Sequence, residues 1–279
     1  MQTITLGNGV MIPAPGFGTW RAADGDETFQ SVSDALSAGY RHIDTASFYG
    51  NQRSVGEAIR ASGLRREEVF VTSKLWNDDH GREEARLAFE ETLRELGFDY
   101  LDLYLIHWPI PLAHREDWRE SNAETWRTFE ELYEAGKIRA LVVSNFRPHH
   151  LEALLETAEI RPMVDQIEFH PGQNQPETLE FCRKNDILVE AWAPLGRGAT
   201  FDHPVLQGIA AEHHKSVAQV CLRWEWQLGL IPLPKSVKRE RIRENFAIFD
   251  FTLSEEQMRQ ISDLPPMART CHDPDNLPF

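Results

Sequence analysis

The chain has few cysteines and no long hydrophobic run, and each absence excludes a class of protein. Its three cysteines, Cys182, Cys221 and Cys271, are too widely spaced for a disulfide framework or a zinc site. No apolar stretch approaches the ~20 residues that cross a bilayer, and the first residues lack the basic and apolar regions of a secretory signal. We therefore expect a soluble, cytoplasmic protein with reduced thiols and no bound metal.

Lysine is scarce as well. Only six of the 29 basic residues are lysines, and 44 acidic residues give a net charge of −15. Such a charge repels nucleic acid and anionic membranes, so we expect neither as a partner. The acidic, lysine-poor composition is compatible with adaptation to salt, although a GC-rich genome would also favour arginine. A ligand that carries phosphates would need a local cluster of basic residues.

No linker or low-complexity segment interrupts the chain, so we predict one domain over residues 1–279. Within residues 1–15, Gly7-Asn8-Gly9 lies between the apolar runs Thr3–Leu6 and Val10–Ile12. Asn-Gly between two such runs is a hairpin signal, and we expect the hairpin to cap one end of the main body. Residues 263–279 form an irregular tail that contains several prolines.

Eight short apolar runs alternate with amphipathic stretches along the rest of the chain. Most of these runs are nearly continuous, which is typical of parallel strands covered on both faces. Eight repeats of strand and helix predict an α/β fold, a closed (β/α)8 TIM barrel. The expected strands are Gly16–Trp20, His42–Ala46, Val69–Trp76, Leu101–Trp108, Ile138–Phe146, Val164–His170, Leu188–Leu195 and Leu230–Val237.

Apolar spacing and end signals define the expected helices. Gly97 and Gly136 each follow a helix as a C-terminal glycine, and Pro148 and Pro176 each stand in a first turn. Ser254 with Gln257 matches a capping box. The expected helices are Thr28–Ala38, Glu83–Leu96, Ala123–Ala135, His149–Ala158, Glu177–Asn185, Val217–Leu228 and Ser254–Ser262.

An open, doubly wound sheet is the runner-up architecture. Its dinucleotide sites use G-x-G-x-x-G between the first strand and a helix. The segment Gly16–Arg21 lacks the third glycine, and no helix start follows it. The sequence therefore favours the barrel.

In such barrels the chemistry lies at the C-terminal ends of the strands. Asp44, Lys74 and His107 lie at or near the ends of three successive expected strands, and Tyr49 follows Asp44 in a loop. A buried lysine needs a partner, which Asp44 can supply. Lys74 would lower the pKa of a nearby Tyr49 phenol, and His107 could orient a carbonyl oxygen. The four residues suit carbonyl reduction, with Tyr49 as the proton donor opposite a hydride donor.

Each of these residues alone is often structural, so two other functions stay open. His42, Asp44, His107 and His170 also lie near strand ends, as the ligands of a metal-dependent barrel hydrolase would. Lys74 has no role in that interpretation. The other alternative is a non-catalytic module that senses a cofactor on the same fold, and the intact set of four residues argues against it.

The motifs around these residues resemble those of the aldo-keto reductase family, especially the bacterial 2,5-diketo-gluconate and methylglyoxal reductases. The resemblance extends from Leu6 to about Phe251. The matching segments are Gly39–Ala46, Tyr49–Asn51, Val55-Gly56, Ser73–Trp76, Asp102–Pro109, Val143–Phe146, Gln166–Glu168, His170-Pro171 and Pro234–Ser236, with Arg241 and Asn245.

The resemblance implies that NADPH binds across the top of the barrel without a Rossmann fold. It places Asp44, Tyr49, Lys74 and His107 in catalysis. Trp192 would stack on the nicotinamide, at a position where many relatives have tyrosine. Ser144, Asn145 and Gln166 would hold the carboxamide, and Leu195 and Gly196 would lie against the pyrophosphate. Lys235, Ser236 and Arg241 would bind the 2′-phosphate, with Asn245 toward the adenine. The other implied cofactor-binding residues are Gly18, Thr19, Trp20, Pro194, Val237, Lys238 and Glu244.

A basic run supplies the cluster that a phosphate ligand needs. Lys235, Lys238, Arg239, Arg241 and Arg243 follow the last expected strand and open a helix, where anions bind well. Phosphate sites after strands seven and eight are common in these barrels. Because only NADPH offers a 2′-phosphate for these residues to pair with, the run favours NADPH over NADH.

One departure from the family pattern concerns charge. The residue before Gln166 is Asp165, where the family usually has asparagine. A negative charge at this position would weaken cofactor binding modestly.

Aromatic residues surround Tyr49 in the expected barrel. Trp20, Phe48, Trp76 and Trp108, together with His107, predict an aromatic-walled pocket for a small carbonyl substrate. In the family the C-terminal loop closes one side of this pocket, and the tail residues Arg269, His272 and Asn276 could reach a polar substrate. We expect the protein to act as a monomer.

Overall fold

The computed structural model describes residues 2–267 and 269–279. Its main sheet has eight parallel strands that follow one another in sequence order. Gly16 N donates to the Pro232 oxygen and Gly18 N to the Pro234 oxygen, both at 3.1 Å, so the first strand meets the last and the predicted barrel closes. The strands are β3 (Phe17–Gly18), β4 (His42–Asp44), β5 (Phe70–Leu75), β6 (Leu101–Ile106), β7 (Ile138–Ser144), β8 (Val164–Glu168), β9 (Leu188–Trp192) and β10 (Ile231–Leu233).

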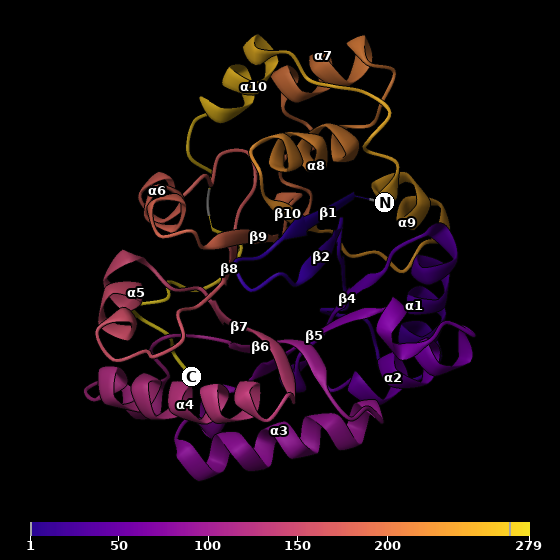
Figure 1. The fold of residues 1–279 in the computed structure, drawn as a ribbon. Coiled ribbons are helices and arrows are strands. Elements are labelled where there is room, and N and C mark those ends of the chain that lie inside the picture. Colours follow the sequence, from indigo (N-terminus) through magenta and orange to yellow (C-terminus); the bar gives the residue numbers. More distant parts are fainter. Residues whose placement is uncertain (1, 268) are drawn as a thin grey trace.

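Helices surround the strands (Figure 1). The predicted capping box is present, since Ser254 Oγ accepts from Gln257 N and Gln257 Oε1 accepts from Ser254 N. In the described ranges, no helix combines the length and apolarity needed to cross a bilayer. The helices are α1 (Asp26–Ala38), α2 (Gln52–Ala61), α3 (Arg82–Leu96), α4 (Trp118–Glu134), α5 (Pro148–Leu155), α6 (Pro176–Lys184), α7 (Pro204–Glu212), α8 (Val217–Gln227), α9 (Arg239–Phe246) and α10 (Glu255–Ser262).

Some element bounds differ from the sequence predictions. Helices α2 and α7 were not predicted. Helix α4 begins at Trp118 rather than at Ala123, and its first residues were missed because they lack the apolar spacing of the rest of the helix. The strands are shorter than predicted. At two strand ends the backbone leaves the extended conformation, since Asn145 (φ 65°) and Ala193 (φ 50°) adopt positive φ. These residues begin the loops that carry the site.

Two apolar cores flank the strands. The outer core packs the strands against the helices and includes Trp126, Phe129 and Trp224. The inner core fills the barrel, with Leu103, Val142, Val164 and Leu233 among its members. Because side chains alternate along a strand, a residue two positions beyond an inner-core residue also points into the barrel.

The predicted hairpin closes the other end of the barrel. Strands β1 (Gln2–Thr5) and β2 (Met11–Ala14) pair antiparallel and lie across the ring of strands in Figure 1. Leu6 and Ile12 belong to the inner core, and Asn8 Nδ2 donates to the Arg139 oxygen near the start of β7 (2.9 Å). The hairpin therefore covers the N-terminal strand ends and leaves the C-terminal ends free for chemistry.

Candidate active site

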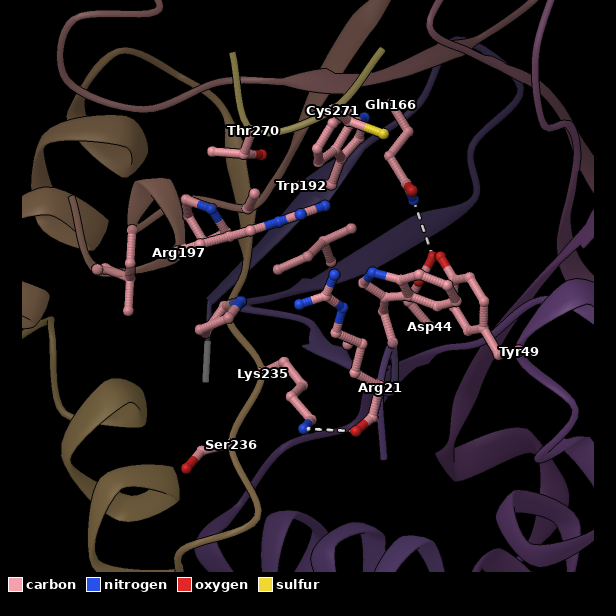
Figure 2. A pocket seen from close by; sticks show the side chains of 18 of the residues that line it. Arg21, Asp44, Tyr49, Gln166, Trp192, Arg197, Lys235, Ser236, Thr270 and Cys271 are labelled. Atoms are coloured by element: carbon pink, nitrogen blue, oxygen red, sulfur yellow. Dashed lines mark hydrogen bonds between the residues drawn. The ribbon is translucent and has the colours of Figure 1, made fainter. Parts of the chain in front are cut away.

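A cavity of about 1100 Å³ opens at the C-terminal ends of the strands. Its walls come from strand ends, from the loops that follow them and from the C-terminal tail (Figure 2). Most of the predicted site residues lie together on these walls. They are Gly18, Trp20, Asp44, Phe48, Tyr49, Trp76, His107, Trp108, Ser144, Asn145, Gln166, Trp192, Pro194, Leu195, Lys235, Ser236, Arg241, Glu244, Asn245, Arg269 and His272.

The remaining predicted residues lie outside this wall. Thr19 is buried, and its Oγ1 donates to the Asp44 carbonyl oxygen (3.0 Å). Gly196 packs against the His170 ring, where a Cβ would lie 3.3 Å from Nδ1. Val237 and Lys238 are exposed beyond Ser236. The full set outside the wall is Thr19, Lys74, Gly196, Val237, Lys238 and Asn276.

Lys74 and Asp44 form a buried ion pair beneath the cavity. Lys74 Nζ donates to Asp44 Oδ1 (2.6 Å), to the Thr45 carbonyl oxygen (2.9 Å) and to the Tyr49 hydroxyl (3.2 Å). The two charged side chains are only 1% and 5% exposed, and such burial is tolerated because both are paired and hydrogen-bonded. Since the Tyr49 oxygen accepts from Lys74, its own hydrogen is free to be donated into the cavity.

The net shift of the Tyr49 pKa is opposite to the sequence prediction. Burial raises the pKa of this phenol above its ordinary value of 10.0, and the Lys74 charge only partly lowers it. Burial alone would lower the pKa of Lys74. Asp44 and Tyr49 together raise it by more than burial lowers it, so the net pKa lies above 10.5 and the ammonium stays charged. The predicted lowering was wrong because burial outweighs Lys74. Tyr49 is consequently a neutral phenol, which is the form that donates a proton.

His107 stands beside Tyr49 as a neutral imidazole. Burial, together with the Lys74 charge, lowers the pKa of His107 well below 6.5. The ring centroid of His107 lies 5.9 Å from that of Tyr49 and 5.2 Å from that of Trp76. A neutral imidazole keeps one N–H. His107 can therefore donate to the same carbonyl oxygen that Tyr49 protonates.

A hydrogen-bonded group of amides and an indole lies next to this pair. Asn145 Nδ2 donates to the His107 carbonyl oxygen (2.9 Å), and Trp192 Nε1 donates to Asn145 Oδ1 (2.9 Å). Ser144 Oγ donates to the Gln166 carbonyl oxygen (2.8 Å). These bonds fix the Trp192 ring and the amides at the cavity wall, where they can hold a flat, amide-bearing ring.

Several basic side chains line the cavity. Among them are Arg21, Arg197, Lys235 and Arg241, and none of these four forms an ion pair with a carboxylate of the described residues. Figure 2 shows Arg21 and Arg197 extending into the cavity from different loops. In a chain of net charge −15, four unpaired cations in one cavity indicate an anion site.

Sequence reasoning missed two of these cations. Arg21 directly follows Trp20, and Arg197 lies between two glycines in the turn Gly196–Gly198. That position was a usable signal, since a basic residue in a glycine loop often meets an anion. Other wall residues that were not predicted are Ala193, Gly198, Phe201, Ser216, Val217, Ala218, Leu233, Pro234, Thr270, Cys271 and Phe279.

The tail forms a wall beside the aromatic residues. The Phe279 ring stacks on Trp76 with centroids 5.5 Å apart. Glu168 Oε1 accepts from Thr270 N (2.5 Å) at the start of this wall. Farther along, Asp275 pairs with Arg147, and its Oδ1 lies 2.9 Å from His149 Nε2. The tail is thus attached to the barrel by β8 and by the N-terminal end of α5.

Removing the anchor on α5 should loosen the aromatic wall. In Asp275→Ala the contacts to Arg147 and to the histidines of α5 are lost. We expect KM for aromatic aldehydes to rise several-fold with kcat little changed, because the anchor does not touch the reacting atoms. Steady-state kinetics measures this, with the neighbouring exposed Asn276→Ala as control. Equal KM values for the two variants would contradict the anchor.

The metal-site alternative is not supported by the positions of its histidines. His42 Nε2 bonds Thr72 Oγ1 inside the barrel (3.1 Å), whereas His170 Nδ1 lies 3.0 Å from the Pro171 oxygen. Within residues 2–267 and 269–279, the one group of three potential ligands whose donor atoms lie within 4.8 Å of one another is on α5 and the tail. The candidate ligands of the hydrolase alternative therefore do not form a metal-binding group.

The surroundings of Asp165 disfavour the charge that its position suggested. Its side chain is fully buried on β8, and burial raises the pKa of this carboxyl well above 3.8. Burial therefore favours the uncharged form of this carboxyl and reduces the electrostatic weakening that its position suggested.

Comparisons with known proteins agree with this geometry. A profile described as the Aldo/keto reductase family matches residues 15–265. A glyoxal reductase of Bacillus subtilis is 50% identical over 278 residues, covering 100% of this chain and 98% of that protein. An aldo/keto reductase structure from Brucella melitensis has a TM-score of 0.88 at 47% identity, covering 94% of this chain and 98% of that one. A Bombyx mori aldo-keto reductase in complex with NADP has a TM-score of 0.86 at 38% identity, with 94% and 92% covered.

The chain belongs to the aldo/keto reductase family. It is accordingly an NADP-dependent oxidoreductase that acts on carbonyl groups.

Proposed function

We propose that the protein reduces aldehydes, ketones or dicarbonyls to alcohols with NADPH, and that Tyr49 is the general acid. One observation carries this proposal. The Tyr49 hydroxyl accepts a hydrogen bond from Lys74 (3.2 Å), and Tyr49 lines, with His107, a cavity whose wall also holds cations without carboxylate partners. A proton donor and an anion site in one cavity suit the reduction of a carbonyl by a phosphate-bearing hydride donor.

NADPH fits the donor groups of this cavity. Ser144, Asn145 and Gln166 offer hydroxyl and amide groups for its carboxamide, and Trp192 offers a flat surface for its ring. Arg21 and Arg197 suit the pyrophosphate, and Lys235, Ser236 and Arg241 suit the 2′-phosphate. When bound, NADPH supplies the hydride.

The chain's own residues bind the carbonyl group and supply the proton. Neutral His107 and Tyr49 both donate hydrogen bonds to the carbonyl oxygen and orient it. As that oxygen becomes an alkoxide, the Tyr49 proton moves to it and gives the alcohol. Lys74 stabilises the phenolate that remains, and Asp44 keeps Lys74 charged.

Small dicarbonyls are the substrates that we propose first. A relative at 50% identity is a glyoxal reductase, and Trp76 and Phe279 offer apolar walls beside Tyr49 for a compact substrate. A screen over glyoxals, simple aldehydes and keto-sugars tests this substrate class, with the reaction monitored by the loss of NADPH absorbance. Absence of NADPH oxidation with every carbonyl tested would overturn the proposed function.

Arg241 should discriminate between the two nicotinamide cofactors. Arg241→Ala is expected to raise the Kd for NADPH by about tenfold or more, because a charge-assisted bond to the 2′-phosphate is lost. The Kd for NADH should change little. Fluorescence titration with both cofactors measures the difference, and Arg243→Ala, also exposed on α9 but outside the cavity wall, is the control. Equal weakening for NADPH and NADH would exclude a 2′-phosphate contact.

We infer that the enzyme acts as a monomer in the cytoplasm and that the barrel is one domain. Residues from one chain supply the proton donor, its partners and the cation cluster, so the site needs no second subunit. Its cysteines are free thiols, two of them buried, which suits a reducing compartment.

A further inference from the structure

The side-chain amide of Gln166 lies between two carboxyl groups. Its Nε2 donates to Asp44 Oδ2 (2.8 Å) and to Glu190 Oε2 (3.0 Å). Figure 2 shows the first of these bonds at the cavity wall, and the pairing of β8 with β9 makes Gln166 and Glu190 direct neighbours. Since both carboxyl oxygens accept, the NH2 end of the amide must face them. The carbonyl oxygen Oε1 is the atom of the amide that is left for another partner.

Glu190 has no part in the chemistry described above, yet it is fully buried inside the barrel. Its Oε1 lies 3.8 Å from His42 Nε2 and has no hydrogen-bond partner among the described residues. An apolar side chain would fill this position at a lower cost, because burying a carboxyl is unfavourable. The contact that Glu190 does make is the one to Gln166.

The ionisation of Glu190 is compatible with this contact. Burial raises the pKa of Glu190 to about 8; the Gln166 hydrogen bond and Lys74 lower it, and Asp44 raises it. Near neutral pH the carboxyl is therefore protonated. Burial lowers the pKa of the facing His42 to about 4, so that ring is neutral too. Glu190 can accept from Gln166 without placing a second negative charge beside Asp44.

We propose that Glu190 is a positioning residue of the cofactor site, which together with Asp44 holds the Gln166 amide with its carbonyl oxygen toward the cavity. The inference rests on the proposed function, in which that oxygen accepts an N–H of the nicotinamide carboxamide. A single contact to Asp44 leaves the amide plane free to turn. The second contact fixes it, so that less rotational freedom is lost when the carboxamide binds.

The test compares two cofactors that differ only in the group that Gln166 would meet. The acetylpyridine analogue of NADP+ has a methyl ketone in place of the carboxamide and cannot donate a hydrogen bond. Dissociation constants for both come from quenching of tryptophan fluorescence. We expect the wild-type protein to bind NADP+ about tenfold more tightly than the analogue. Glu190→Met should reduce this ratio to about two or less, and Glu190→Gln, which can still accept from Gln166, should restore it.

A second buried acid provides the matched control. Glu225 on α8 is also fully buried, and neither of its carboxyl oxygens has a hydrogen-bond partner among residues 2–267 and 269–279. Glu225→Met removes a buried carboxyl without touching Gln166, so the ratio should stay at the wild-type value. If Glu190→Met does not fold, Glu190→Asp tests the same contact. The aspartate side chain is one methylene shorter, so its carboxyl lies farther from Gln166 and the ratio of the two dissociation constants should fall.

The outcomes separate this inference from the function on which it rests. An unchanged ratio in Glu190→Met or Glu190→Asp overturns the positioning role, and so does a wild-type protein that binds both cofactors equally. In both cases the protein would still bind NADP+ and the reductase assignment would stand. A wild-type protein that binds neither cofactor would overturn both proposals.

Discussion

Tyr49→Phe is expected to lower kcat for carbonyl reduction by about 10²–10⁴-fold while the Kd for NADPH stays near the wild-type value. The substitution keeps the ring that packs against Trp20, with centroids 4.8 Å apart. It removes the hydroxyl that accepts from Lys74 and donates to the carbonyl oxygen. Steady-state NADPH oxidation and fluorescence titration of NADPH measure the two quantities on the same preparation.

The control for this variant is Tyr133→Phe. The Tyr133 hydroxyl accepts from Asn8 at 3.3 Å and does not line the cavity, so both kcat and Kd should be unchanged. Wild-type kcat in Tyr49→Phe would show that another group supplies the proton, and His107 would be the next candidate because it lines the same wall.

Lys74→Met should be costly for both folding and catalysis. Asp44 would remain as a buried charge without its partner. Breaking such a pair lowers the free energy of unfolding by about 3–5 kcal/mol. The phenolate of Tyr49 would lose its neighbouring charge, so kcat should fall by about a hundredfold or more. Urea unfolding and NADPH oxidation measure the two effects.

A surface ion pair gives the comparison for Lys74. Lys215 Nζ lies 2.6 Å from Asp250 Oδ2, but that carboxylate is 62% exposed. Water replaces the lost contact there, so Lys215→Met should destabilise the protein far less and leave kcat unchanged. If Lys74→Met and Lys215→Met lowered the free energy of unfolding equally, the buried pair of Lys74 and Asp44 would contribute no more to stability than a surface pair, contrary to this prediction.

The barrel, and the placement of the four catalytic candidates at one end of it, could be predicted because they depend on local patterns. Strand β5 lies within the predicted run Val69–Trp76, and Lys74 stays at its end even though the strand is shorter. Errors of one to four residues at the C-terminal strand ends do not change which residues reach that side of the barrel. The four catalytic candidates therefore meet at one end of the barrel as the sequence indicated.

Properties that depend on three-dimensional surroundings could not be predicted. The Tyr49 pKa is set mainly by burial, which no motif encodes. Glu190 was overlooked, because its contact with Gln166 requires the register of β8 against β9. The anchor of Asp275 on α5 joins residues more than a hundred positions apart, and sequence spacing gives no signal for such a pair.

The central claim is that this protein transfers a hydride from NADPH to a carbonyl carbon, and isotope transfer tests it most directly. The wild-type protein is incubated with an aromatic aldehyde and NADPH that is dideuterated at its reactive ring carbon. The account predicts one deuterium on the alcohol carbon of the product, found by mass spectrometry, and the same product without deuterium in light NADPH. An alcohol that carries no deuterium, or formation of no alcohol, would contradict it.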